Sequence, residues 1–164
     1  MTVPLVVFLV LVAAVLAFGI LTRAPALELS QAVAVLSDGD LDGDERKALL
    51  RRLLRQCEEE AGEFASRVGV SAAMALGDET AFRSFEQRAA GFPSAKEGAA
   101  AVDSESLVVL GLGDPLVLNV QRALHAEQYG NKGDAAVVWR QVLAQSRLTG
   151  AVFAGAEARR RLGE

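Results

Sequence analysis

The chain has 164 residues, a formal net charge of −4 and a pI of about 5.1, which excludes the broad basic surface typical of nucleic-acid-binding proteins. Aromatic residues make up only 5% of the chain, and long runs of alternating β-branched residues are missing beyond the N-terminal segment. This composition favours helices over a sheet, and the length leaves room for one small domain. We therefore expect an all-α fold.

The chain begins with an apolar stretch, PLVVFLVLVAAVLAFGIL, which covers residues 4–21 without a charged side chain. As a helix it would rise about 27 Å, close to the thickness of a bilayer core. A cleaved signal peptide is the alternative, but the stretch is too long for one. We predict a transmembrane anchor over 1–23 and a soluble helical domain over 24–164. Contacts with other membrane helices are expected at its small residues, Ala13, Ala14, Ala17 and Gly19.

The charge that flanks the anchor indicates its orientation. Arg23 follows the apolar stretch, and no basic side chain precedes it. Because basic residues stay on the cytoplasmic side, we predict a single-pass protein of a bacterial membrane with a cytoplasmic domain; a periplasmic domain is the alternative.

Apolar periodicity predicts the helices of the first half. A helix over 27–36 precedes the polar turn SDGDLDGD, and a long helix follows from Glu45 to Val68, where Gly69 ends it. A short apolar piece covers 71–76, and a further helix runs from 78 to 90. The small and polar residues 94–104 predict an internal loop.

The second half predicts three or four more helices. The apolar run 107–112 fits a strand or a buried helix by periodicity, and its all-helical context favours a helix. Asp114 and Pro115 are typical N-cap and first-turn residues of a helix that reaches Tyr129. Two helices, over 134–145 and 150–162, complete the chain, the last one capped by Thr149.

The acidic turn partly matches a calcium-binding loop. Asp38, Asp40 and Asp42 occupy the first, third and fifth positions of an EF-hand, but Leu49 stands where that loop needs a bidentate glutamate. We favour a structural role, in which Asp42 or Asp44 caps the following helix. The alternative function for the chain is a membrane-tethered calcium or ion sensor built on this loop.

The helix after this turn carries a basic face. Arg51, Arg52 and Arg55 lie opposite its apolar stripe and are candidates for contact with anionic lipid headgroups or a partner protein. A solvated face is the alternative, because Glu58–Glu60 follow directly and weaken the attraction to lipid.

Catalytic motifs are not evident. His125 is the only histidine, Cys57 is the only cysteine and lies on an apolar stripe, and the sequence contains no nucleophile elbow, P-loop or HExxH motif. We predict neither catalytic residues nor a metal, cofactor or small-molecule substrate. An enzyme that uses His125 is the remaining possibility of that class.

The stretch ALHAEQYGNKGDAAVVWRQVLAQS resembles a tetratricopeptide helical hairpin, with Tyr129 on the first helix and Trp139 on a second helix that looks short. The resemblance covers about 30 residues, one repeat, and implies a helical scaffold that binds a partner in a groove, with no chemistry of its own. Tyr129 and Trp139 are candidate partner contacts, although such residues also pack between helices.

Together these features predict a tetratricopeptide-like or irregular helical bundle behind a membrane anchor. We expect a non-enzymatic accessory, scaffold or assembly subunit of a membrane complex, with the lipid bilayer and other membrane-protein subunits as partners and no nucleic acid.

Overall fold

A computed structural model describes residues 28–92, 104–129 and 132–164, and throughout these ranges the regular structure is helical, which confirms the all-α prediction. The helices of the described ranges are α2 (Leu29–Ser37), α3 (Gly43–Glu59), α4 (Glu63–Leu76), α5 (Glu79–Gly91), α6 (Ser104–Leu110), α7 (Pro115–Gln128), α8 (Lys132–Thr149) and α9 (Val152–Leu162).

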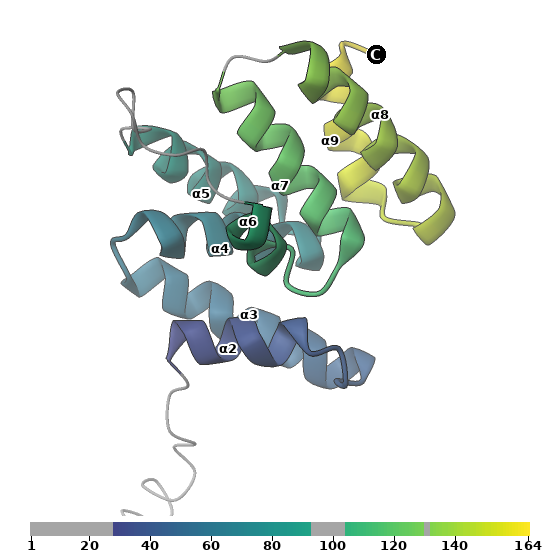
Figure 1. The fold of residues 1–164 in the computed structure, drawn as a ribbon. Helices are drawn as coiled ribbons and strands as arrows, with labels where there is room; N and C mark the ends of the chain where they lie inside the picture. The colour runs from purple at the N-terminus through teal and green to yellow at the C-terminus, as the bar shows by residue number, and fades with distance from the viewer. Residues whose placement is uncertain (1–27, 93–103, 130–131) are drawn as a thin grey trace, which may run out of the picture.

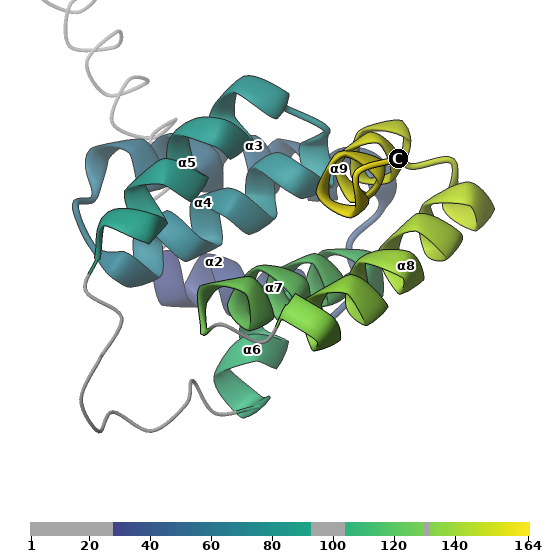
Figure 2. The same cartoon turned by 90° about the horizontal axis from the view of Figure 1, so that it is seen from above.

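Most helices pack against their neighbours in the chain. Figure 1 shows α2 and α3 together at one end, α4 and α5 in the middle, and α7, α8 and α9 at the other end. The view from above separates a layer of α3, α4 and α5 from one that contains α7 and α8 (Figure 2). The short helix α6 lies against α4 and α7 and links the two layers.

The core is centred on α4, which contacts α3, α5, α6 and α7. All residues from Ala65 to Met74 are buried, including Gly69. A Cβ at Gly69 would lie 2.4 Å from the Phe85 ring, so only glycine permits this approach of α5 to α4. The small residues of α4 thus allow several helices to pack closely around it.

The structure corrects the prediction of one helix from Glu45 to Val68. The chain turns between α3 and α4, where Glu60 is extended (ψ 128°). The guanidinium of Arg88 in α5 donates to the carbonyl oxygens of Cys57 (3.1 Å) and Glu60 (2.5 Å), and so satisfies the end of α3. Gly69 therefore lies inside a helix, and the separate apolar piece predicted over 71–76 is the end of α4.

The predicted N-cap at Asp114 is confirmed, and Asp78 caps a further helix in the same way. Asp78 accepts from the Ala81 backbone N–H at 3.0 Å, and Asp114 accepts from that of Leu116 at 2.8 Å with Pro115 in the first turn. The predicted cap at Thr149 is wrong, because its hydroxyl donates backwards to the Gln145 carbonyl of α8.

The predicted bounds of α8 also change. That helix extends from Lys132 to Thr149, beyond the expected range of 134–145, and α9 starts only at Val152. The second helix of the predicted hairpin is therefore not short.

Two predicted segments lie outside the described residues. The apolar stretch 4–21, with Ala13, Ala14, Ala17 and Gly19, is one of them, and residues 94–103 of the predicted loop are the other. Across the described ranges, no helix combines the length and apolar character needed to cross a bilayer.

Candidate functional site

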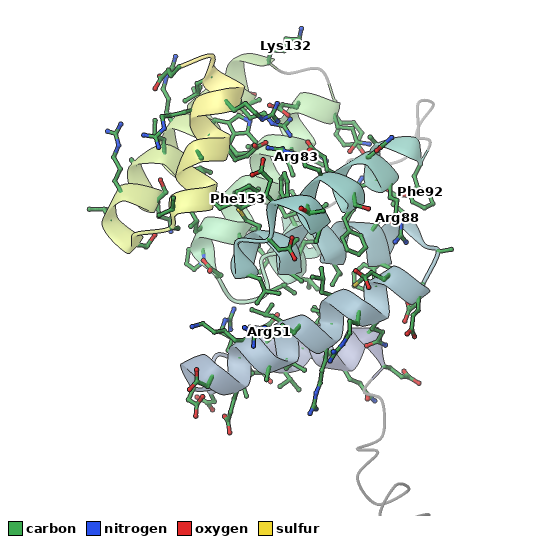
Figure 3. The ribbon with its side chains drawn as sticks, turned by 180° about the vertical axis from the view of Figure 1, so that it is seen from behind. Arg51, Arg83, Arg88, Phe92, Lys132 and Phe153 are labelled. Atoms are coloured by element: carbon green, nitrogen blue, oxygen red, sulfur yellow. The ribbon has the colours of Figure 1, made fainter. Side chains whose placement is uncertain are left out.

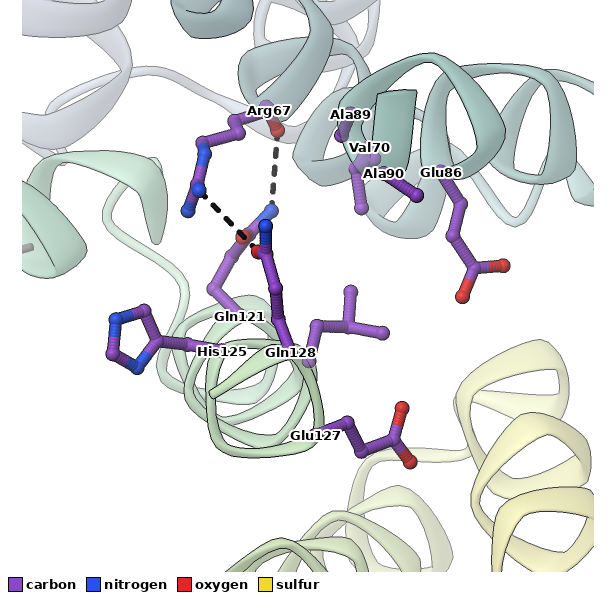
Figure 4. A pocket seen from close by; sticks show the side chains of 10 residues that line it. Arg67, Val70, Glu86, Ala89, Ala90, Gln121, His125, Glu127 and Gln128 are labelled. Carbon is purple, nitrogen blue, oxygen red and sulfur yellow. Dashed lines mark hydrogen bonds between the residues drawn. The ribbon is translucent and has the colours of Figure 1, made fainter. Parts of the chain in front are cut away.

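A cleft of about 250 Å³ opens between α5 and α7, with α4 at its base. Figure 4 shows its walls, with Ala89 and Ala90 on the α5 side and Gln128 on the α7 side. Val70 and Leu124 add further apolar surface. The cleft thus combines a lining of small apolar groups with polar side chains at its edges.

One edge of the cleft is built from polar groups that join α4 to α7. The guanidinium of Arg67 bonds to Glu63 at 2.8 Å. It also bonds to the Gln128 side chain at 3.4 Å (Figure 4). The amide of Gln121 donates to the Arg67 carbonyl at 3.1 Å and to the Ser71 hydroxyl at 2.8 Å. These bonds are largely buried, so they hold this wall in one arrangement.

The Ser71 hydroxyl extends this network to α6. It donates to the Leu110 carbonyl at 2.6 Å, at the end of that helix. The polar network of the cleft therefore also fixes α6 on α4.

Charged side chains form the opposite edge of the cleft and extend to α9. Glu86 of α5 and Glu127 of α7 both extend toward α9 (Figure 4), where the guanidinium of Arg161 pairs with each of them. Glu127 also accepts from the indole N–H of Trp139 at 2.7 Å. We call this set the ion cluster; its members are Arg83, Glu86, Glu127, Glu157, Arg160 and Arg161.

Glu157 lies at the centre of the ion cluster, and its side chain is fully buried. Its carboxylate bonds to Arg83 (2.5 and 2.9 Å), Arg160 (2.8 and 3.0 Å) and Arg161 (2.7 Å). Burial opposes ionisation of Glu157, but the hydrogen bonds from Arg83, Arg160 and Arg161 outweigh it and hold the pKa well below the usual range. The carboxylate is therefore ionised at neutral pH and ties α9 to α5.

His125 and Tyr129 form an aromatic pair near the C-terminal end of α7, with ring centroids 4.2 Å apart. Tyr129 is 43% exposed, as a partner contact requires. The Nε2 atom of His125 is buried and has no hydrogen-bond partner within the described chain. Burial and the charge of Arg67 lower the pKa of His125, so the ring is neutral at pH 7.

Trp139 does not lie on the surface as a predicted partner contact should. The side chain is only 1% exposed, and the Arg161 guanidinium lies 5.5 Å from its ring centroid. Trp139 therefore packs in the core between α7, α8 and α9, and not at a surface that a partner could contact.

The acidic turn before α3 provides a helix cap. The Asp42 carboxylate accepts from the backbone N–H groups of Asp44 (2.9 Å) and Glu45 (2.8 Å), which confirms the predicted capping role. No group of three potential metal ligands gathers anywhere in the described ranges, and Asp38 and Asp40 are exposed. The geometry gives the calcium alternative no support.

The predicted basic face is on the outside of α3, where Arg51, Arg52 and Arg55 are exposed. Cys57 faces the opposite way and is buried. Burial, with a smaller contribution from Glu60, raises the pKa of Cys57 to about 12, so its thiol is protonated and unreactive at neutral pH.

The sequence did not indicate the cleft residues Arg67 and Gln121 or the ion cluster. One signal was available for Glu157, which stands on the same helix face as the buried Ala154 and precedes three consecutive arginines. An acid on an apolar stripe needs cationic partners, and Arg160 and Arg161 are two of the three partners of Glu157. No local pattern marks Arg67 or Gln121 as cleft residues, because the contacts that join them across the cleft come from another helix.

Comparison with known protein families, curated proteins and solved structures finds no match to this chain. The resemblance to a tetratricopeptide hairpin stays a prediction.

Proposed function

We propose that this chain is a non-enzymatic accessory subunit of a membrane complex, anchored through residues 4–21, whose helical domain holds a segment of a partner subunit in the cleft between α5 and α7. The observation that carries the proposal is the open cleft, which has an apolar lining and lies between helices that hydrogen bonds and ion pairs hold in place. Ala89, Ala90 and Leu124 offer surface that a partner's apolar side chains can cover.

The size of the cleft supports a protein partner. Sites for small molecules typically enclose about 300–1,000 Å³, whereas this cleft holds about 250 Å³ and is open to one side. It therefore suits two or three side chains of a docked segment, in the manner of a helix laid into a groove.

The rigidity of the cleft walls also supports the binding of a partner segment. The bonds of Gln121 fix α7 to α4, and Arg161 fixes Glu86 of α5 and Glu127 of α7 to α9. A preformed site loses little conformational entropy on binding, which favours affinity for the partner.

The environments of Cys57 and His125 favour a role without catalysis. The Cys57 thiol is buried and protonated, and His125 makes no hydrogen bond through Nε2 within the described part of the chain. Neither residue forms a nucleophile–base pair there.

Site-specific photo-crosslinking in cells of the source organism tests the proposal. A photoreactive residue at Ala90, inside the cleft, should give a crosslink to one membrane-protein subunit, identified by mass spectrometry. The matched position is Ala144, an exposed alanine of α8 outside the cleft lining. Equal crosslinking from both positions, or none from Ala90, would refute the cleft as the binding site.

A further inference from the structure

The outer side of α3 carries cations without counterions. Lys47, Arg51 and Arg55 follow one another at four-residue spacing, and Arg52 lies beside them. All four are exposed, and none forms a hydrogen bond or ion pair with another residue in the described ranges. We call these four residues the α3 basic face.

Another arginine of the same helix behaves differently. Arg46 donates to the Leu36 carbonyl at 3.0 Å and to the Leu112 carbonyl at 2.5 Å, so it joins α3 to α2 and to the turn after α6. The basic stretch seen in the sequence therefore divides into a structural residue and a free face. Like charges at four-residue spacing repel one another on a helix, so the free face gains from an external polyanion.

The apolar side of α3 determines where this face points. Leu50, Leu53 and Leu54 are buried in the core, so the basic residues point away from it. Figure 3 labels Arg51 on α3, in the layer that α2 and α3 form. Acidic residues are confined to the two ends of the helix, at Asp44 and Glu45 and at Glu58–Glu60.

The α3 basic face is also near the proposed anchor along the chain. Eight residue steps separate Leu21 from Leu29, the first residue of α2, and they span at most about 28 Å when fully extended. Because α2 packs against α3, this layer cannot move far from a bilayer that holds residues 4–21. The local concentration of lipid headgroups at α3 is then high.

We propose that the α3 basic face docks on anionic phospholipid headgroups of the membrane that holds the anchor. The proposal rests on the anchor in the proposed function. Docking would place the α2–α3 layer against the bilayer, and the α7–α9 end of the molecule would face the aqueous phase (Figure 1). The cleft would then stay open to a partner.

Fluorescence quenching tests the docking with the full chain in lipid nanodiscs. A dye on Ala48→Cys, an exposed position of α3, is compared with a dye on Ala144→Cys in α8. The buried Cys57 does not compete for the dye. A quencher on the lipid headgroups should quench the α3 dye strongly in discs with phosphatidylglycerol, weakly in discs of phosphatidylcholine alone, and weakly again at high salt.

Charge-reversal variants distinguish an effect of the α3 basic face from an effect of the net charge of the protein. Reversing Arg51, Arg52 and Arg55 to Glu should lower the ratio of docked to free domain by at least about 100-fold, because the loss of each basic residue near an anionic surface alone costs roughly fivefold. The matched variant reverses three other exposed arginines, Arg140, Arg147 and Arg159, and should leave the quenching unchanged.

Three results would overturn the docking proposal. Equal quenching of the α3 dye in the two lipid compositions would refute the docking but not the anchor. An equal loss of quenching in the two triple variants would do the same. A chain that fails to enter the discs would refute the anchor and the docking together.

Discussion

The substitution Glu157→Gln removes the negative charge at the centre of the ion cluster and keeps the size of the side chain. The buried carboxylate bonds to Arg83, Arg160 and Arg161, so the variant leaves three guanidinium groups without their shared counterion. Breaking a buried ion pair typically costs 3–5 kcal/mol. Arg83 and Arg160 retain 33% and 54% exposure and can regain water. We therefore expect a loss of about 3 kcal/mol in the free energy of unfolding, the lower end of that range.

Urea titration followed by circular dichroism measures this loss for the purified chain in mild detergent. At a slope of about 2 kcal/mol per molar, the midpoint should fall by about 1.5 M urea. The control is Glu79→Gln, because Glu79 is 67% exposed and lies 3.5 Å from the same Arg83. The control should cost less than about 0.5 kcal/mol. Equal losses in the two variants would refute the argument that burial makes Glu157 important.

The pH dependence follows from the direction of the Glu157 shift. The folded-state pKa lies below the unfolded value, about 4.3, so the carboxylate contributes stability above that pH and loses it as the pH falls. The difference between the wild-type chain and Glu157→Gln should therefore shrink below about pH 4.3. A difference that stays constant down to pH 3 would contradict this.

Two further predictions concern the core. Gly69→Ala should cost about 2 kcal/mol of unfolding free energy, because its Cβ would overlap the Phe85 ring. The control, Gly43→Ala, should be nearly neutral in the same urea titration, because no atom lies within 4 Å of the new Cβ. A neutral Gly69→Ala would contradict the close packing of α4 and α5. Cys57 should react with iodoacetamide at pH 8 only after unfolding, because burial raises its pKa to about 12, and rapid reaction of the native chain, followed by mass spectrometry, would disprove this.

Local signals predicted several features of the fold correctly. Asp42 and Asp114 precede their helices and accept from the first backbone N–H groups, an interaction that depends on residues next to one another in the chain. The apolar stripe of α3 also placed Cys57 on the buried side of the helix. Such features need no knowledge of the tertiary structure.

Features that depend on distant residues could not be predicted in this way. The turn between α3 and α4 interrupts a continuous apolar stripe, and it is satisfied by Arg88, 28 residues beyond Glu60. Gly69 looked like a helix terminus because its packing partner, Phe85, lies in another helix. Glycine is tolerated in the middle of α4 because that close contact requires it.

The cleft could not be predicted from the sequence for the same reason. Tyr129 was singled out from the sequence and is exposed near the cleft, whereas Trp139 was singled out by the same resemblance and is buried. The lining residues come from three helices, and only their packing brings Arg67 next to Gln128. The sequence identified aromatic residues of the hairpin but not the cleft beside it.

Blue-native electrophoresis of membranes extracted with mild detergent tests the central claim most directly. The wild-type chain should migrate in a complex far larger than its own 17.3 kDa. Ala90→Trp, which fills the cleft, should release the chain from that complex, and Ala144→Trp on α8 should leave the complex intact. Migration of the wild-type chain only as a free 17.3 kDa species, or an unchanged complex in Ala90→Trp, would contradict the proposed function.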